Sequence, residues 1–142
     1  MEKKLSREHL FYAFSPELEP ALRVAQGEEF VLETQDCFSG QLKSEKDLLD
    51  SLNWERVNPA TGPVFIENVQ PGDVVRIDLL KLKVVDHATM VTLPGEGVLG
   101  DQLKKMETAV LRFEDDKVIF RDKLALKMAT MVGVIGVAPA EG

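Results

Sequence analysis

Between Asn58 and Asp73 the sequence is N-P-A-T-G-P-V-F-I-E-N-V-Q-P-G-D, which places one short apolar run between two groups of turn residues. The pairs N-P and G-P before the run, and the triplet P-G-D after it, are combinations that favour turns. Val64–Ile66 therefore has the length and composition of a short β-strand. A second apolar run begins at Val74, directly after the last turn. This alternation of strands and tight turns predicts a mainly β protein with antiparallel strands.

The rest of the chain shows the same pattern of short apolar runs separated by turn residues. Alternating apolar residues predict further strands at 5–14, 21–24, 29–34, 74–85, 107–114, 117–122 and from 124 toward 137. Ser44 to Leu52 is the best helix candidate, because its leucines have helical spacing and Ser44 can cap it. Residues 86–101 are expected to form a long glycine-rich loop. The whole predicts a single antiparallel β-sandwich domain, residues 1–142, with one short helix and long loops.

Composition excludes several classes of protein. The formal net charge of −7 argues against binding to nucleic acid. The single cysteine, Cys37, excludes an internal disulfide and a multi-cysteine zinc site, and it fits a cytoplasmic location. The first residues lack the apolar run of a signal peptide, and the most apolar stretch, 124–139, is interrupted by a lysine and glycines. We therefore expect neither nucleic acid nor a membrane among the partners.

Two carboxylates near a strand end are the first candidates for chemistry. Glu33 and Asp36 lie at the end of the predicted strand 29–34, where side chains can project into a cleft. Paired carboxylates can activate a water molecule and protonate a leaving amine, with or without a metal ion. The same spacing also fits an acidic turn that is exposed to solvent, so the residues alone leave both interpretations open.

The other reactive side chains each have a structural alternative. Cys37 would need a base to act as a nucleophile, and it is equally expected as a small buried apolar residue. Asp86 and His87 open the glycine-rich loop and could bind metal or move protons. A surface histidine is the simpler explanation, because neighbours on a strand point to opposite faces. His9 lies among aromatic residues, which favours a structural role. The glycines of 94–101 could hold a ligand by backbone N–H groups or form a plain connection.

Four segments of the chain resemble the acetamidase/formamidase family, and they occur in the family's order. The stretch 58–73 is similar to the family's N-P-x-T-G-P-V-x-[IV]-E-x-[AV]-x-P-G-D. Residues 23–36, R-V-A-Q-G-E-E-F-V-L-E-T-Q-D, resemble the family's opening, in which a strand, a glycine turn and a second strand end in E-T-x-D. Residues 94–101, P-G-E-G-V-L-G-D, and 133–139, G-V-I-G-V-A-P, resemble two further family segments. The resemblance implies a first domain that is a jelly-roll-like sandwich.

The resemblance also implies a function. Family members hydrolyse short linear amides such as acetamide and formamide to a carboxylate and ammonia, so a small amide is the expected substrate. Asp36 falls on the aspartate of E-T-x-D and becomes the expected metal ligand and site carboxylate, with Glu33 as a second catalytic carboxylate. Zinc or calcium is the expected metal, and no organic cofactor is expected.

Family chains are about twice as long, and their second half carries a G-D-x-H-x-x-Q-G-D-G-E segment that this sequence lacks. We therefore expect an incomplete active site in this chain alone, and either a homo-oligomer or pairing with a C-terminal half. The alternative is a non-catalytic β-sandwich module for binding or assembly. A carbohydrate-binding jelly roll finds little support, because one tryptophan and one tyrosine are too few for a stacking platform.

Overall fold

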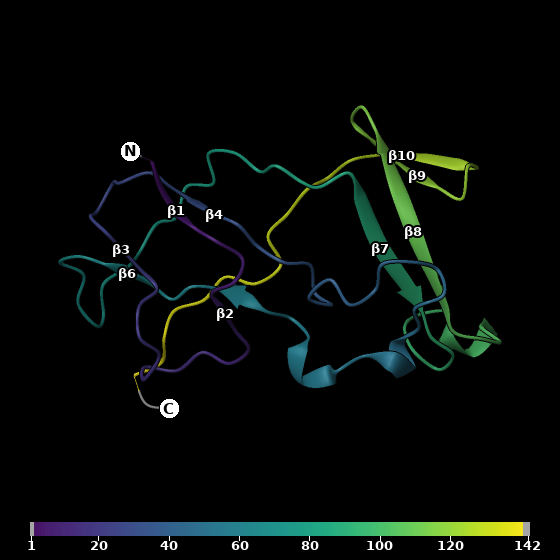
Figure 1. Cartoon of the computed structure of the whole chain (residues 1–142), viewed down its shortest axis with the longest axis horizontal. Helices are drawn as coiled ribbons and strands as arrows, with labels where there is room; N and C mark the ends of the chain where they lie inside the picture. The colour runs from purple at the N-terminus through teal and green to yellow at the C-terminus, as the bar shows by residue number, and fades with distance from the viewer. Residues whose placement is uncertain (1, 141–142) are drawn as a thin grey trace. The chain divides into compact units, whose positions relative to one another are not determined.

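The computed structural model describes residues 2–140, and these residues divide into two compact units (Figure 1). Unit 1 contains the described residues up to Ser39, Trp54–Asp78 and the described residues from Val132 onward. Unit 2 contains Gly40–Asn53 and Leu79–Met131. Each unit is thus built from segments that are far apart in the sequence.

Unit 1 is held together by three two-stranded ladders. The parallel pairs are β1 (Lys3–Leu5) with β4 (Phe30–Leu32), and β3 (Leu22–Val24) with β6 (Val64–Ile66). The antiparallel pair is β2 (Leu10–Phe11) with β5 (Ala60–Thr61). Leu5 and Val24 are almost fully buried, so each parallel pair contributes one residue to the apolar core.

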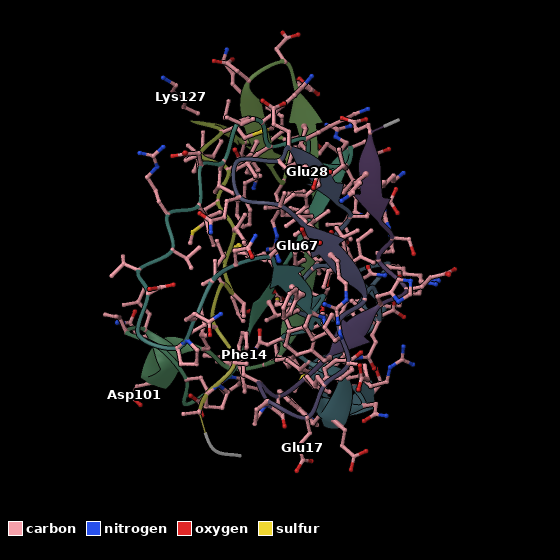
Figure 2. All side chains as sticks on the ribbon, turned by 90° about the vertical axis from the view of Figure 1, so that its left-hand side faces the viewer. Phe14, Glu17, Glu28, Glu67, Asp101 and Lys127 are labelled. Carbon is pink, nitrogen blue, oxygen red and sulfur yellow. The ribbon has the colours of Figure 1, made fainter. Side chains whose placement is uncertain are left out.

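Aromatic side chains add to the packing of unit 1. Phe11 and Phe14 meet edge to face, with ring centroids 5.3 Å apart, a geometry in which the positive ring edge meets the negative ring face. The Phe14 ring also lies against Gly136 (Figure 2), where an added Cβ would come within 2.9 Å of the ring. Glycine at position 136 therefore lets the C-terminal segment pass close to the aromatic pair.

Unit 2 is built on a four-stranded antiparallel sheet with the order β10-β9-β8-β7 (Figure 1). Its strands are β7 (His87–Thr92), β8 (Glu107–Glu114), β9 (Lys117–Phe120) and β10 (Leu124–Lys127). The β8–β9 hairpin confirms the sequence prediction for residues 107–122. Asp115 in its two-residue turn has a φ of 55°, the left-handed conformation that tight hairpin turns favour.

One face of this sheet is covered by the segment Gly40–Asn53 of the same unit. The Thr108 hydroxyl donates a hydrogen bond to the backbone C=O of Asp47 at 2.5 Å. The Thr89 hydroxyl donates to the backbone C=O of Leu42 at 3.3 Å. The buried leucines of the covering segment are Leu42, Leu49 and Leu52. These contacts make the segment the outer layer of unit 2 on that side.

The predicted helix over 44–52 is wrong, because its sequence forms a turn followed by a single turn of 3-10 helix at Leu49–Ser51. The Asp47 carboxylate accepts hydrogen bonds from the N–H groups of Lys43 and Ser44 and from the Ser44 hydroxyl, at 2.8 to 3.1 Å. These bonds close a turn before a helix can propagate, and Leu48 is extended, with φ −110° and ψ 160°. The described chain has two further short 3-10 turns: Trp54–Arg56 and Gly100–Gln102.

The predicted strand over 74–85 is also wrong, since no residue of this segment belongs to a strand. A strand needs a neighbour for its backbone groups, and none of the described strands pairs with this segment. Instead, β7 forms at the start of the predicted loop 86–101, where β8 supplies the partner. The predicted strand 5–14 is replaced by the separate strands β1 and β2, and the last predicted strand is shortened to β10.

The structure confirms a mainly β chain, and the short strands predicted at 21–24, 29–34 and 64–66 are present as β3, β4 and β6. The sheets are small and open, and the β1–β4 and β3–β6 pairs are parallel, so antiparallel pairing throughout is wrong. The jelly-roll-like sandwich is not confirmed, and the single domain of residues 1–142 stays a prediction. Among residues 2–140 we find no helix with the length and apolarity that a membrane crossing requires.

Candidate functional site

Asp36 lies in unit 1, in a turn that follows β4, and it is exposed to solvent. Its carboxylate oxygen Oδ1 accepts a hydrogen bond from the N–H of Phe38 at 2.7 Å. Its backbone C=O accepts a second bond from the N–H of Ser39 at 2.9 Å. An aspartate that bonds the backbone two residues onward is a common way to stabilise a turn. The structure therefore fixes Asp36 by a local turn, at the surface of unit 1.

A second loop of unit 1, around residues 56–58, is tied to this turn by two backbone hydrogen bonds. The N–H of Asn58 donates to the C=O of Cys37 at 2.7 Å, and the Ser39 hydroxyl donates to the C=O of Arg56 at 2.6 Å. Ser39 and Asn58 both have left-handed backbone, with φ of 53° and 55°. Such conformations are uncommon for residues other than glycine, and they are found at functional sites where the surroundings fix them.

Tyr12 joins the same cluster from the loop after β2. Hydrogen bonds with Ser39 and Arg56 lower the pKa of the Tyr12 phenol, and the side chain is 41% exposed. A phenol, a hydroxyl and a guanidinium therefore gather beside the Asp36 turn. Sequence reasoning missed Tyr12, Ser39 and Arg56, because they come from three separate segments and none belongs to a local motif. The only available signal was the N-P pair that begins at Asn58.

Glu33, the second predicted carboxylate, forms an ion pair with Lys4 at 2.5 Å. The hydrogen bond from Lys4 is the main reason why the pKa of Glu33 is lowered, and the charges of Lys4 and Arg7 act in the same direction. The backbone C=O of Glu33 accepts a hydrogen bond from the Thr61 hydroxyl at 2.9 Å. Glu33 is therefore ionised at neutral pH, and it is held by partners different from those that hold the Asp36 turn.

Cys37 is exposed, so the alternative of a small buried apolar residue is wrong. Desolvation by neighbouring atoms raises the pKa of its thiol even though the residue as a whole is exposed, and the Asp36 charge raises it further. Only the thiolate is strongly nucleophilic. The environment of Cys37 therefore disfavours a role as a nucleophile at neutral pH.

In unit 2, the Asp86 and His87 side chains meet, with Oδ1 and Nδ1 2.7 Å apart. The expectation that strand neighbours point apart is wrong here, since Asp86 precedes the strand that His87 begins. The hydrogen bond with His87 lowers the pKa of Asp86. Both residues are exposed, which suits the surface-histidine interpretation. His9 is exposed too.

The glycine-rich loop of unit 2 closes on itself. Gly95 donates its N–H to the C=O of Gly100 at 3.1 Å, and a Cβ added at Gly100 would lie 2.6 Å from the carbonyl carbon of Gly95. The glycine at position 100 is therefore explained by the close approach of two backbone segments. This geometry favours the plain connection over a ligand loop.

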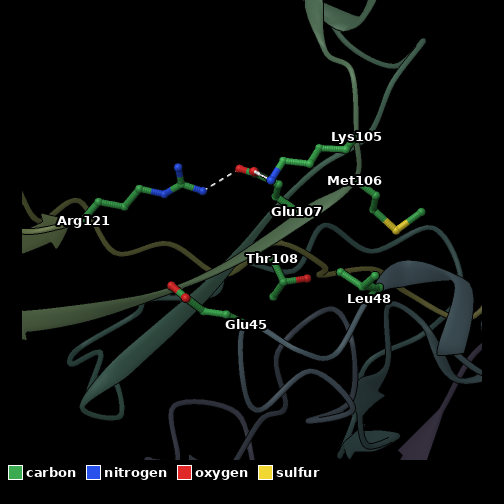
Figure 3. A pocket seen from close by; sticks show the side chains of 7 residues that line it. All are labelled: Glu45, Leu48, Lys105, Met106, Glu107, Thr108 and Arg121. Atoms are coloured by element: carbon green, nitrogen blue, oxygen red, sulfur yellow. Dashed lines mark hydrogen bonds and ion pairs between the residues drawn. The ribbon is translucent and has the colours of Figure 1, made fainter.

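A shallow pocket of about 220 Å³ lies on unit 2 (Figure 3). Glu107 sits between two cations, with Lys105 at 2.8 Å and Arg121 at 2.6 Å (Figure 3). These partners, Lys105 first, lower the pKa of Glu107 to about 2. The remaining lining residues are Glu45, Leu48, Met106 and Thr108. Because Glu107 already pairs both cations, the pocket offers no obvious free charge to an anionic ligand.

A second, larger pocket of about 450 Å³ lies on unit 1. Its wall includes the loop 15–20, rich in proline and acidic residues, and the side of Phe65. The guanidinium of Arg23 stacks over the Phe65 ring at 4.3 Å, a favourable cation–π geometry. The pocket offers apolar surface, but the predicted residues Glu33 and Asp36 are not among those that line it.

Metal binding requires several donor side chains to converge. Among residues 2–140, no group of three or more His, Cys, Asp or Glu side chains is arranged to hold a metal ion. Asp36 could supply one oxygen ligand, so the described residues do not make a complete metal site by themselves.

Comparisons with known proteins agree along the whole chain. The model of the Acetamidase/Formamidase family matches residues 1–142, whereas no curated protein matches. A crystal structure of a predicted acetamidase/formamidase from Thermoanaerobacter tengcongensis is 46% identical over 100% of this chain and 47% of that one, with a TM-score of 0.93. An acetamidase structure from Bacillus halodurans is 38% identical over 96% of this chain and 46% of that one, with a TM-score of 0.92. An acetamidase structure from Yersinia enterocolitica, at 23% identity, 89% and 43% coverage and a TM-score of 0.72, shares the fold. The chain thus spans about half the length of the structures it matches.

Proposed function

The chain belongs to the acetamidase/formamidase family, and on this premise we propose that it forms part of an enzyme that hydrolyses short linear amides. The reaction cleaves the C–N bond of acetamide or formamide and yields a carboxylate and ammonia. The 46% identity to the Thermoanaerobacter tengcongensis protein, over the whole of this chain, is the observation that carries the proposal. The hydrolase class follows from the family, whereas the choice of linear amides is our proposal.

Hydrolysis of an amide requires a positioned water molecule, a base to remove its proton and an acid to protonate the leaving amine. We assign the base to Asp36, because its turn holds the carboxylate at the surface of unit 1. The ion pair with Lys4 and the lowered pKa make Glu33 a weak base. These contacts favour a role for Glu33 in positioning the loop over a role in proton transfer.

Tyr12 and Arg56 supply the hydrogen-bond donors of this cluster. A phenol with a lowered pKa is a better proton donor than an ordinary tyrosine, and hydrogen bonds with Ser39 and Arg56 provide that shift for Tyr12. We propose that these donors orient the amide carbonyl beside Asp36. A divalent ion such as zinc or calcium would polarise that carbonyl when bound, with Asp36 as one ligand and other ligands from outside the described residues.

Matched structures contain about as much chain again beyond the stretch that aligns with residues 1–142. We refer to this additional part of a family chain as the complementary segment. We propose that turnover needs the complementary segment, because the described residues bring no three metal-ligating side chains together. The assembled protein is proposed to be a homo-oligomer, or a pair with the complementary segment, in the cytoplasm.

The second candidate is a non-catalytic β module for binding or assembly. It is favoured by the exposed apolar side chains in the segment 74–85, which no strand of the described chain covers. Amide turnover and metal content distinguish the two candidates, since an assembly module needs neither.

The test is ammonia release from formamide and acetamide, with added zinc or calcium, by the chain alone and by the chain co-purified with the complementary segment. Asp36→Ala is compared with the parent, and Asp50→Ala, an exposed carboxylate of unit 2, is the matched control. Turnover by the assembly that is lost only in Asp36→Ala supports the proposal. An assembly that binds metal and turns over neither amide contradicts it.

A further inference from the structure

The segment 79–85 has the sequence of a half-buried strand but lies outside every sheet of the described chain. Its sequence, L-L-K-L-K-V-V, alternates apolar and charged residues at positions 80–84. In an extended chain, Leu80, Leu82 and Val84 project to one side, and Lys81 and Lys83 project to the other. This pattern is typical of a strand with one buried face and one face in water.

The apolar side of this segment is open to solvent in the structure. Leu80 is 70% exposed, Leu82 is 41% exposed and Val84 is 44% exposed. No residue of 79–85 is part of a strand, and none of the described strands is paired with it. A row of exposed, aligned apolar side chains on an unpaired strand-like segment favours association.

A separate feature of unit 2 points in the same direction. β10 is exposed along its whole length, and its two leucines, Leu124 and Leu126, are about half exposed. β10 pairs with β9 on one side, and no described strand pairs with its other edge. Unit 2 therefore presents both an uncovered strand-like segment and an uncovered sheet edge.

We propose that residues 79–85 become a β-strand when the chain associates with its complementary segment, with Leu80, Leu82 and Val84 packed against that segment. The occupant follows from length: the matched structures contain about as much chain again as the part that aligns here. Backbone pairing would satisfy the N–H and C=O groups of 79–85, and burial of the apolar side would remove the exposed surface. Lys81 and Lys83 would remain in solvent. This inference rests on the proposed need for the complementary segment.

The experiment uses this 142-residue chain co-expressed with the complementary segment of the Thermoanaerobacter tengcongensis relative. Amide hydrogen exchange is measured on the free chain and on the purified complex. We expect the amides of 79–85 to exchange fast in the free chain and to become protected in the complex. A complex without protection at 79–85, or no complex at all, would overturn the inference, as would protection that arises from self-association of the chain alone.

Two double variants separate the two sides of the proposed strand. Leu80→Ser with Leu82→Ser removes apolar surface, and we expect affinity for the complementary segment to fall about tenfold per leucine. Lys81→Ser with Lys83→Ser makes the same number of changes on the other side, and we expect affinity close to that of the parent. All four residues are exposed in the free chain, so both variants should keep the parent's melting temperature. Equal loss in both variants, or loss in neither, contradicts the proposed orientation.

Ammonia release from the same complex is read separately. A protected complex that fails to hydrolyse formamide or acetamide would refute the proposed function and leave the strand inference standing. Turnover without protection at 79–85 would do the reverse.

Discussion

Replacement of Gly100 by alanine should destabilise unit 2 through a steric clash. The new Cβ would lie 2.6 Å from the carbonyl carbon of Gly95 and 3.1 Å from its Cα. Ordinary van der Waals contact begins at about 3.4 Å, so one backbone segment must retreat by about 0.8 Å. Both contacts are with backbone, which cannot turn aside as a flexible side chain can. Gly100 has no positive φ, so the cost is packing and involves no forbidden conformation.

The hydrogen bonds of the loop set the size of the effect. The C=O of Gly100 accepts bonds from the N–H groups of Gly95 and Leu103, both at 3.1 Å, and its own N–H donates to Gly97 at 3.2 Å. A shift of the backbone strains this set. Overpacking of a filled site costs about 1–3 kcal/mol, which lowers the apparent melting temperature of a protein of this size by roughly 4–10 °C.

The assay is urea unfolding followed by far-ultraviolet circular dichroism, with thermal unfolding as a second probe. Gly133→Ala is the matched control, because a Cβ at position 133 meets no atom within 4 Å and its φ is not positive. We expect that control to match the parent or to be slightly more stable. A Gly100→Ala variant as stable as the parent, or a control equally destabilised, would refute the steric argument.

Three further predictions concern other sites. Thr108→Val should destabilise the fold by about 1–3 kcal/mol, because it leaves the C=O of Asp47 without its 2.5 Å donor; urea unfolding should show no comparable loss for the exposed Thr130→Val. The pKa of Glu107 is about 2 in the folded chain against 4.5 for the model group, so its ionised form stabilises the fold above about pH 4.5, and this contribution is lost as the pH falls toward 2. Urea midpoints from pH 7 to pH 2.5 should therefore fall more steeply for the parent than for Glu107→Gln, and parallel slopes would count against the ion pairs. The raised pKa of Cys37 predicts slow alkylation by iodoacetamide at pH 7 with a rate still rising above pH 9, whereas a plateau by pH 8 would contradict it.

The elements that the sequence predicts well are those whose partners are close along the chain. β8 and β9 pair through a two-residue turn, and Asp115 in that turn takes the left-handed backbone that the D-D pair suggested. The segments that fail depend on partners elsewhere. Residues 74–85 alternate like a strand, but no described strand is available to them. Residues 44–52 have helical spacing, but Asp47 binds the backbone at the start and closes a turn.

The candidate site shows the same limit more strongly. Asp36 and Glu33 could be chosen from their place at a strand end, and their partners could not. Tyr12, Ser39 and Arg56 come from three segments whose contact depends on the fold of unit 1. Local spacing contains no information about such contacts, whereas a family pattern marks the segments without saying how they meet.

The stretch that decides the fold also builds the candidate site. Asn58 donates its N–H to the C=O of Cys37, beside Asp36. Thr61, three residues later, donates its hydroxyl to the C=O of Glu33. The N-P-x-T pattern therefore attaches one loop to the backbone of both predicted carboxylate residues, from opposite sides of the segment between them. Loss of either bond would move a carboxylate without changing it, because the bonds act on the main chain. The turn residues that identify the family are thus the scaffold that positions Glu33 and Asp36.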